Sequence, residues 1–157
     1  MKKLFSVLAV LFVLGTVNVF AWGIGPEGGT RPGYGGGSGG LSLKIDGVPC
    51  VFGLSGYFGS AGTSIGVTAD WWIANPKIER TWGYYYGVGV AGSFATDGNK
   101  AGMFVGGRFF AGTNVFFLNN FMELYLQGAW QPGIFLTDPV TFSTNGFPVN
   151  IGLRFWF

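Results

Sequence analysis

The last nine residues, Val149-Asn-Ile-Gly-Leu-Arg-Phe-Trp-Phe157, give the clearest indication of the fold. Apolar side chains occupy every second position from Val149 to Phe157, and Asn150, Gly152 and Arg154 lie between them. Strict alternation over this length is typical of a β-strand with one apolar and one more polar face. The C-terminal stretch is therefore predicted to be a strand that separates two environments.

The same period of two recurs upstream in six stretches, which are residues 41–46, 52–58, 64–71, 82–91, 103–109 and 122–130. An even-numbered barrel needs an eighth strand, for which we predict residues 22–25, with residues 133–136 as the alternative. Turn-forming residues separate these stretches. Two longer segments rich in glycine or proline, 26–40 and 132–148, are predicted to be exposed loops.

The composition excludes several classes of protein. Thirty glycines in 157 residues are incompatible with a helical bundle, because glycine costs about 1 kcal/mol in a helix interior. Charged residues make up only 10% of the chain, whereas a soluble domain has about 25%. Histidine is absent and Cys50 is the one cysteine, which excludes His-based catalytic triads, most metal sites and an intramolecular disulfide. We expect no enzymatic activity, no cofactor and no metal.

The first residues resemble an export signal. Lys2 and Lys3 precede an uncharged apolar run over residues 4–20, and Ala21 suits cleavage before Trp22. We predict a signal peptide at 1–21 and a single barrel domain at 22–157. Without Lys2 and Lys3, seven basic residues (9 − 2) balance seven acidic ones, so nucleic acid is not an expected partner.

The placement of charge predicts which way the strands face. All six charges of the alternating stretches fall on the less apolar face: Lys44, Asp46, Asp70, Arg108, Glu123 and Arg154. The opposite face carries none. A soluble barrel would hide that apolar face and expose a sparsely charged surface that aggregates. A transmembrane barrel turns the apolar face to lipid and the polar face inward. The sequence therefore predicts an all-β, eight-stranded, antiparallel up-and-down transmembrane barrel.

A lumen enclosed by eight strands is just wide enough for side chains. The three positive and three negative charges sum to zero, and we expect them to form a hydrogen-bonded network, because unpaired burial is costly. Large side chains are expected to fill the space around it: Trp72, Tyr85, Phe104, Tyr125 and Trp156. The alternative is a narrow polar conduit that uses the same charges.

The ending Gly152-Leu-Arg-Phe-Trp-Phe157 resembles the C-terminal signal of bacterial outer-membrane β-barrels, with a terminal Phe and apolar residues at alternate positions. The signal positions are Ile151, Leu153, Phe155 and Phe157. The resemblance implies recognition by the barrel-assembly machinery. The size and plan resemble the small eight-stranded barrels of the OmpA, OmpX and OmpW type, and the glycine-rich strands resemble the small barrels of spirochaetes.

The expected location is the bacterial outer membrane, with outer-membrane lipid as a partner. The leading prediction for function is a structural or surface-interaction role, in which the segments 26–40 and 132–148 form loops outside the cell. A surface partner is not identified by the sequence. The runner-up is a narrow channel or transporter for small hydrophobic molecules, as in OmpW-type barrels. A soluble secreted ligand-binding barrel is the lower alternative.

Overall fold

The computed structural model describes residues 21–32, 35–60, 62–96 and 101–157. The predicted signal peptide, apart from Ala21, lies outside the described residues. The strands are β1 (Trp22–Thr30), β2 (Gly36–Ile45), β3 (Cys50–Gly59), β4 (Gly62–Ala74), β5 (Trp82–Thr96), β6 (Ala101–Phe117), β7 (Met122–Trp130), β8 (Gly133–Leu136), β9 (Thr141–Ser143) and β10 (Val149–Trp156). Among the described residues, no helix is long and apolar enough to cross a lipid bilayer.

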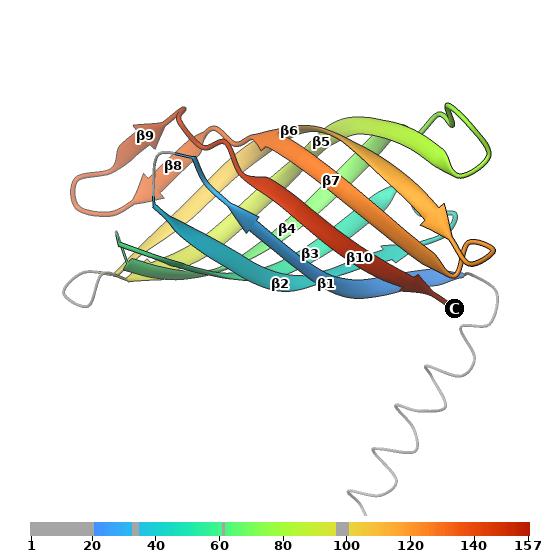
Figure 1. The fold of residues 1–157 in the computed structure, drawn as a ribbon. Helices are drawn as coiled ribbons and strands as arrows, with labels where there is room; N and C mark the ends of the chain where they lie inside the picture. The colour runs from blue at the N-terminus through green and yellow to red at the C-terminus, as the bar shows by residue number, and fades with distance from the viewer. Residues whose placement is uncertain (1–20, 33–34, 61, 97–100) are drawn as a thin grey trace, which may run out of the picture.

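Eight strands form a closed ring, which confirms the predicted antiparallel up-and-down barrel. Each strand from β1 to β6 pairs antiparallel with the next one along the chain. The ring then closes because β7 pairs with β10 and β10 pairs with β1. Both ends of the barrel domain therefore meet at one end of the barrel, on the right in Figure 1. There the Trp22 N–H donates to the Phe157 carbonyl oxygen at 3.1 Å. Closure leaves no free sheet edge within the ring.

The hairpin of β8 and β9 extends the barrel wall at the opposite end (Figure 1). Along β6, β7 pairs as Phe109↔Trp130 and β8 pairs as Met103↔Leu136, so the register does not shift between them. Pro132 lies in the gap and has no N–H to donate to the ladder. Residues 133–136, which were the alternative for an eighth strand, thus continue the strand that β7 begins.

The first barrel strand is longer than predicted. The structure extends it from residues 22–25 to Trp22–Thr30, and β2 begins at Gly36 instead of Leu41. The predicted 26–40 loop was wrong, since only residues 31–35 connect these strands. The 132–148 prediction was wrong in part, because it contains β8 and β9. Glycine-rich strands show no hydrophobic period, and here the neighbouring strands hold them extended, as in the pairing Gly28↔Gly39.

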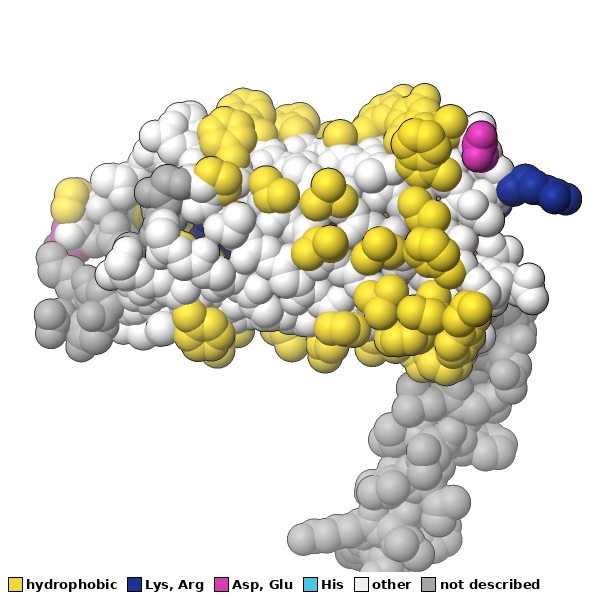
Figure 2. All heavy atoms as spheres, in the orientation of Figure 1, with side chains coloured by type: hydrophobic (Ala, Val, Ile, Leu, Met, Phe, Trp, Pro, Cys, Tyr) yellow, Lys and Arg dark blue, Asp and Glu magenta, His cyan; other side chains and the backbone are white. Residues whose placement is uncertain are grey.

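The exterior of the wall is apolar and the charges face inward, as predicted from the alternation. Every Asp, Glu, Lys and Arg in the strands listed above points into the lumen. Outward positions carry exposed apolar side chains such as Ile65, Val90 and Ile151, which are 67%, 61% and 54% exposed. Figure 2 shows this on one face, where apolar side chains lie along the wall and crowd the end at which the termini meet.

Candidate functional site

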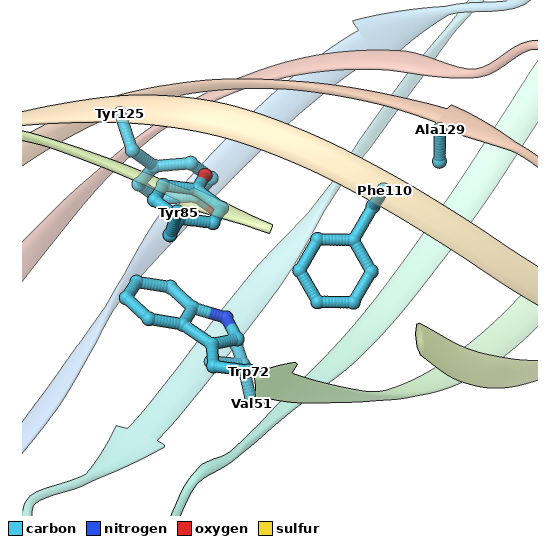
Figure 3. Close-up of a cluster of buried hydrophobic side chains, with 6 residues drawn as sticks. All are labelled: Val51, Trp72, Tyr85, Phe110, Tyr125 and Ala129. Carbon is cyan, nitrogen blue, oxygen red and sulfur yellow. The ribbon is translucent and has the colours of Figure 1, made fainter. Parts of the chain in front are cut away.

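The candidate site is the lumen, which is filled over part of its length by a layer of buried aromatic side chains. Trp72 from β4 and Tyr85 from β5 stack face to face, with ring centroids 4.0 Å apart and planes 4° apart. The Phe110 ring lies 6.3 Å from Tyr85 (Figure 3). These rings form one cluster with Val51, Tyr125 and Ala129. The rings of this cluster come from four consecutive strands, β4 to β7, and together they fill the lumen at this level.

Glycines on neighbouring strands make room for these rings. A Cβ added at Gly112 would lie 2.5 Å from Tyr85 Cζ, and one added at Gly87 would lie 2.6 Å from Phe110 Cζ. Gly152 faces Tyr125 in the same way. Distances under 3 Å are not found for real Cβ atoms. The inward glycines are therefore part of the packing that fills the lumen.

A buried ion pair lies between the aromatic layer and the end with the termini. Arg154 and Glu123 are 1% and 0% exposed, and Arg154 Nη1 donates to Glu123 Oε2 at 3.0 Å. Asn114 Nδ2 and Trp156 Nε1 also donate to the Glu123 carboxylate, at 2.8 and 3.1 Å. Arg154 Nε donates to Ser42 Oγ at 3.0 Å, and its guanidinium lies 3.9 Å over the Tyr125 ring. Both charges are thus neutralised and hydrogen-bonded, the condition under which buried ions are tolerated.

A second buried ion pair lies on the other side of the aromatic layer. Arg108 Nε and Nη2 donate to the two oxygens of Asp70 at 2.9 and 3.3 Å. Gln127 Nε2 donates to Asp70 Oδ2 at 2.8 Å, and Arg108 Nη1 donates to Gln131 Oε1 at 2.7 Å. This fork-like geometry fixes both side chains across the lumen.

Two predicted members of the charge network occupy different places. Asp46 is exposed in the turn after β2, where its N–H donates to the Ala21 carbonyl oxygen at 2.7 Å, so its assignment to the lumen was wrong. Gly47, with a φ of 77°, turns the chain out of the strand at this point. Lys44 does face the lumen, but its ammonium lies over the rings of Trp72 and Trp156, at 4.3 and 5.3 Å.

One lumen charge, Glu27, was not predicted from the sequence. It lies in β1 within the segment predicted as a loop, and its Oε2 accepts a hydrogen bond from Tyr125 Oη at 2.9 Å. Glu27 lies on the same face of β1 as Gly23, Gly25 and Gly29, and this weak period of two was the available signal. With Glu27 in place of Asp46, the lumen still holds three acidic and three basic strand residues.

Two small cavities remain between the Asp70–Arg108 pair and the barrel end far from the termini. Their volumes are about 30 and 40 Å³, and Arg31, Gln131 and Pro148 line both. A water molecule needs roughly 10–15 Å³ of such volume. These cavities have room for a few water molecules rather than for a drug-sized ligand.

The predicted assembly signal lies on the outer face of β10. Ile151, Leu153, Phe155 and Phe157 point away from the lumen, and the Phe157 ring lies 5.0 Å from the ring of Trp22. Phe121 contacts both Phe155 and Phe157, with centroid distances of 5.9 Å. Trp22, the predicted first residue of the mature chain, is also the first residue of β1.

Among solved structures, the chain is similar to the N-terminal β-barrel domain of OprF from Pseudomonas aeruginosa. The TM-score is 0.62 at 15% sequence identity, and the match covers 87% of this chain and 97% of that one. At this identity the likeness shows the barrel fold alone. No protein-family model matches the sequence, and no curated protein matches it at the sequence level.

Proposed function

We propose that the chain is a small integral protein of the bacterial outer membrane, with a side-chain-filled lumen and a structural role. The observation that carries this proposal is the separation of surfaces. Apolar side chains cover the outer wall of the barrel, and the strand charges lie inside it. Water would not stabilise such an exterior, whereas lipid does, and a closed barrel satisfies its backbone hydrogen bonds without water.

Exposed aromatic side chains near the two ends of the wall support a membrane location. Trp22, Trp71 and Trp82 lie toward the end with the termini and are 38%, 53% and 44% exposed. Phe94 and Phe142 lie toward the other end and are each 70% exposed. Aromatic residues are typical of both membrane interfaces in such barrels. We infer that residues 1–21 direct export and are then removed.

A structural role is favoured over solute transport because of the filled lumen. The Trp72–Tyr85 stack and the two buried ion pairs occupy the lumen, and eight strands leave little further space. An enzymatic role finds no support in a chain without histidine, the usual proton carrier near neutral pH. Surface contact is less favoured than the sequence suggested, because residues 31–35 replace the long predicted loop.

The first experiment compares boiled and unboiled samples of the refolded mature chain on a detergent gel, followed by flotation with lipid vesicles. A faster unboiled band and co-flotation are expected for a closed membrane barrel. Identical bands together with a folded β spectrum in detergent-free buffer would contradict the proposal and favour the soluble secreted barrel.

Flux measurements then separate the structural role from the runner-up. Vesicles containing the protein are expected to retain potassium ions, small sugars and a small hydrophobic dye as long as protein-free vesicles do. Faster release of ions or sugars would favour a narrow channel, and faster release of the dye alone would favour a hydrophobic transporter.

A further inference from the structure

A groove lies at the barrel end where the termini meet, between the turn after β2 and the end of β4. Its volume is about 430 Å³, and its walls include Lys44, Val48, Pro49, Trp72 and Ile73. This volume lies in the range of sites that hold part of a small molecule. It is more than ten times the volume of either cavity inside the lumen.

Hydrogen bonds hold the groove in shape. The Trp72 N–H donates to the Pro49 carbonyl oxygen at 2.6 Å and ties the turn to β4. The Val48 N–H donates to the Ile45 carbonyl oxygen at 3.2 Å, and Gly47 adopts a φ of 77° that other residues rarely adopt. The groove is thus formed by a fixed turn against a strand.

The polar wall of the groove holds a cation without an ion-pair partner. Of the lumen cations in the strands, Arg108 and Arg154 each pair with a carboxylate, whereas no described carboxylate lies within 4.0 Å of the Lys44 ammonium. Two aromatic faces, Trp72 and Trp156, contact it instead. Lys44 is half-buried and lines the groove, so its ammonium can bind an anionic group that enters from the mouth of the barrel.

The other wall of the groove is apolar and faces outward. Ile73 is 60% exposed and Val48 is 37% exposed, and both lie at the rim of the outer wall. A ligand that uses both walls must carry an anionic group on one side and hydrocarbon on the other. The exposed charges Lys77, Glu79 and Arg80 on the connection from β4 to β5 do not line the groove.

We propose that this groove binds an anionic phospholipid, with the phosphate at Lys44 Nζ and an acyl chain over Val48 and Ile73. The inference rests on the proposed membrane location, which places this rim at the level of lipid headgroups. A free phosphate ion would contact Lys44 and leave the apolar wall uncovered. An acidic peptide would likewise leave Ile73 exposed, so a lipid fits the two walls best.

The test measures binding of phosphatidylglycerol to the refolded chain in a non-ionic detergent by native mass spectrometry. Lys44→Gln is expected to weaken the saturable site about tenfold or more, because it removes a charge-assisted contact to phosphate. Lys44→Arg is expected to retain binding. The matched control Lys77→Gln, an exposed cation outside the groove, is expected to change the affinity less than twofold. Equal effects of Lys44→Gln and Lys77→Gln would overturn the proposal.

A second comparison tests the apolar wall. Ile73→Asn is expected to weaken phosphatidylglycerol binding several-fold, whereas Ile65→Asn, on the outer face of the same strand far from the groove, is expected to leave it unchanged. If Ile73→Asn has no effect and inorganic phosphate displaces the lipid, the site binds free phosphate. Displacement by a poly-glutamate peptide would point to an acidic protein partner. Either result overturns the lipid assignment.

The boiled and unboiled gel bands verify folding of each variant in detergent, independently of vesicle insertion. A chain that inserts into vesicles but binds lipid equally with Gln or Lys at position 44 refutes this inference alone. A chain that does not insert, whatever its lipid binding, refutes the proposed function.

Discussion

Tyr85 and Tyr125 both point into the lumen, and they differ in what their hydroxyl groups contact. Tyr85 Oη is buried without a hydrogen-bond partner among the described residues, and the same holds for Trp72 Nε1. Tyr125 Oη donates to Glu27 at 2.9 Å. A buried polar group without a partner costs about 1–3 kcal/mol, whereas a hydrogen bond to a charged group contributes about 1.5–3 kcal/mol. The two hydroxyl groups are therefore expected to affect stability with opposite sign.

This difference gives a matched pair of substitutions. Tyr85→Phe is expected to leave the free energy of unfolding unchanged or to raise it, and Tyr125→Phe to lower it by about 1–3 kcal/mol, because only the second removes a hydrogen bond. Urea unfolding in phosphatidylcholine vesicles, followed by tryptophan fluorescence, measures both. A larger loss for Tyr85→Phe than for Tyr125→Phe would contradict the hydrogen-bond assignment.

The buried pair of Arg154 and Glu123 gives a second prediction at this scale. Arg154→Met leaves the Glu123 carboxylate buried without its cation and is expected to cost about 3–5 kcal/mol. Adding Glu123→Leu is expected to recover part of that loss, because no unpaired charge remains. The same unfolding measurement applies, with exposed Arg80→Met as a control expected to stay within about 0.5 kcal/mol. A double variant less stable than the single one would contradict the pairing argument.

At the scale of strands, glycines have two roles that depend on which face they occupy. Inward Gly112 in β6 faces the Tyr85 ring, so a larger residue there must displace it. Outward Gly128 in β7 has nothing within 4 Å of its added Cβ. The same residue type is thus required by packing on one face and not on the other.

Gly112→Val and Gly128→Val test this distinction. Gly112→Val is expected to lower the free energy of unfolding by about 1–3 kcal/mol through overpacking. Gly128→Val is expected to be neutral or stabilising, since valine suits a strand better than glycine. The shift of the folded gel band with temperature gives a direct comparison. Equal losses at both positions would show that the lumen packing is not the cause.

The C-terminal strand is expected to matter for assembly as well as for closure. Removal of Phe157 deletes the ring contacts with Trp22 and Phe121 and the last backbone bonds between the termini. After refolding in detergent, we expect the shortened chain to lose little stability. In cells, we expect much less folded barrel in the membrane, because the assembly machinery is proposed to recognise the C-terminal strand. Comparing refolding yield with the heat-shifted band from cell membranes separates the effects. Equal small losses in both would contradict recognition.

At the scale of the whole molecule, apolar side chains lie on the outside of the barrel and charged strand residues lie inside it, the reverse of a soluble protein. Val90 is 61% exposed near the middle of β5, and Val140 is 64% exposed in the connection between β8 and β9. The two side chains are similarly exposed, but Val90 lies near the middle of the barrel axis and Val140 lies at one end of it. In lipid, the middle of the wall is far more costly for a charge than its end.

Val90→Arg is therefore expected to cost about 2–4 kcal/mol of folding free energy in vesicles, and Val140→Arg about 0–1 kcal/mol. Reversible urea unfolding in lipid measures both substitutions. If the two variants were equally stable in lipid, the assignment of the outer wall to the membrane would be wrong.

The facing of the strands could be predicted from the amino-acid sequence alone, because the alternation of apolar and polar residues is a property of each strand and does not depend on which strands lie beside it. The sequence therefore predicted the barrel, the apolar exterior and the inward positions of Asp70, Arg108, Glu123 and Arg154. It did not extend the first strand past Gly25 or predict that Glu27 replaces Asp46 in the lumen. Residues 22–30 carry few large apolar side chains, so their period of two is weak, and hydrogen bonds to the adjacent strands keep them extended.

The partners of the buried charges became apparent only from the folded barrel. Arg108 pairs with Asp70 across 38 residues of sequence and Arg154 with Glu123 across 31, because ring closure brings their strands together. The same closure leaves Lys44 against two tryptophan rings at the mouth of the barrel. Spacing along the chain does not encode these contacts, since they depend on strand register and on the direction of each side chain across the lumen.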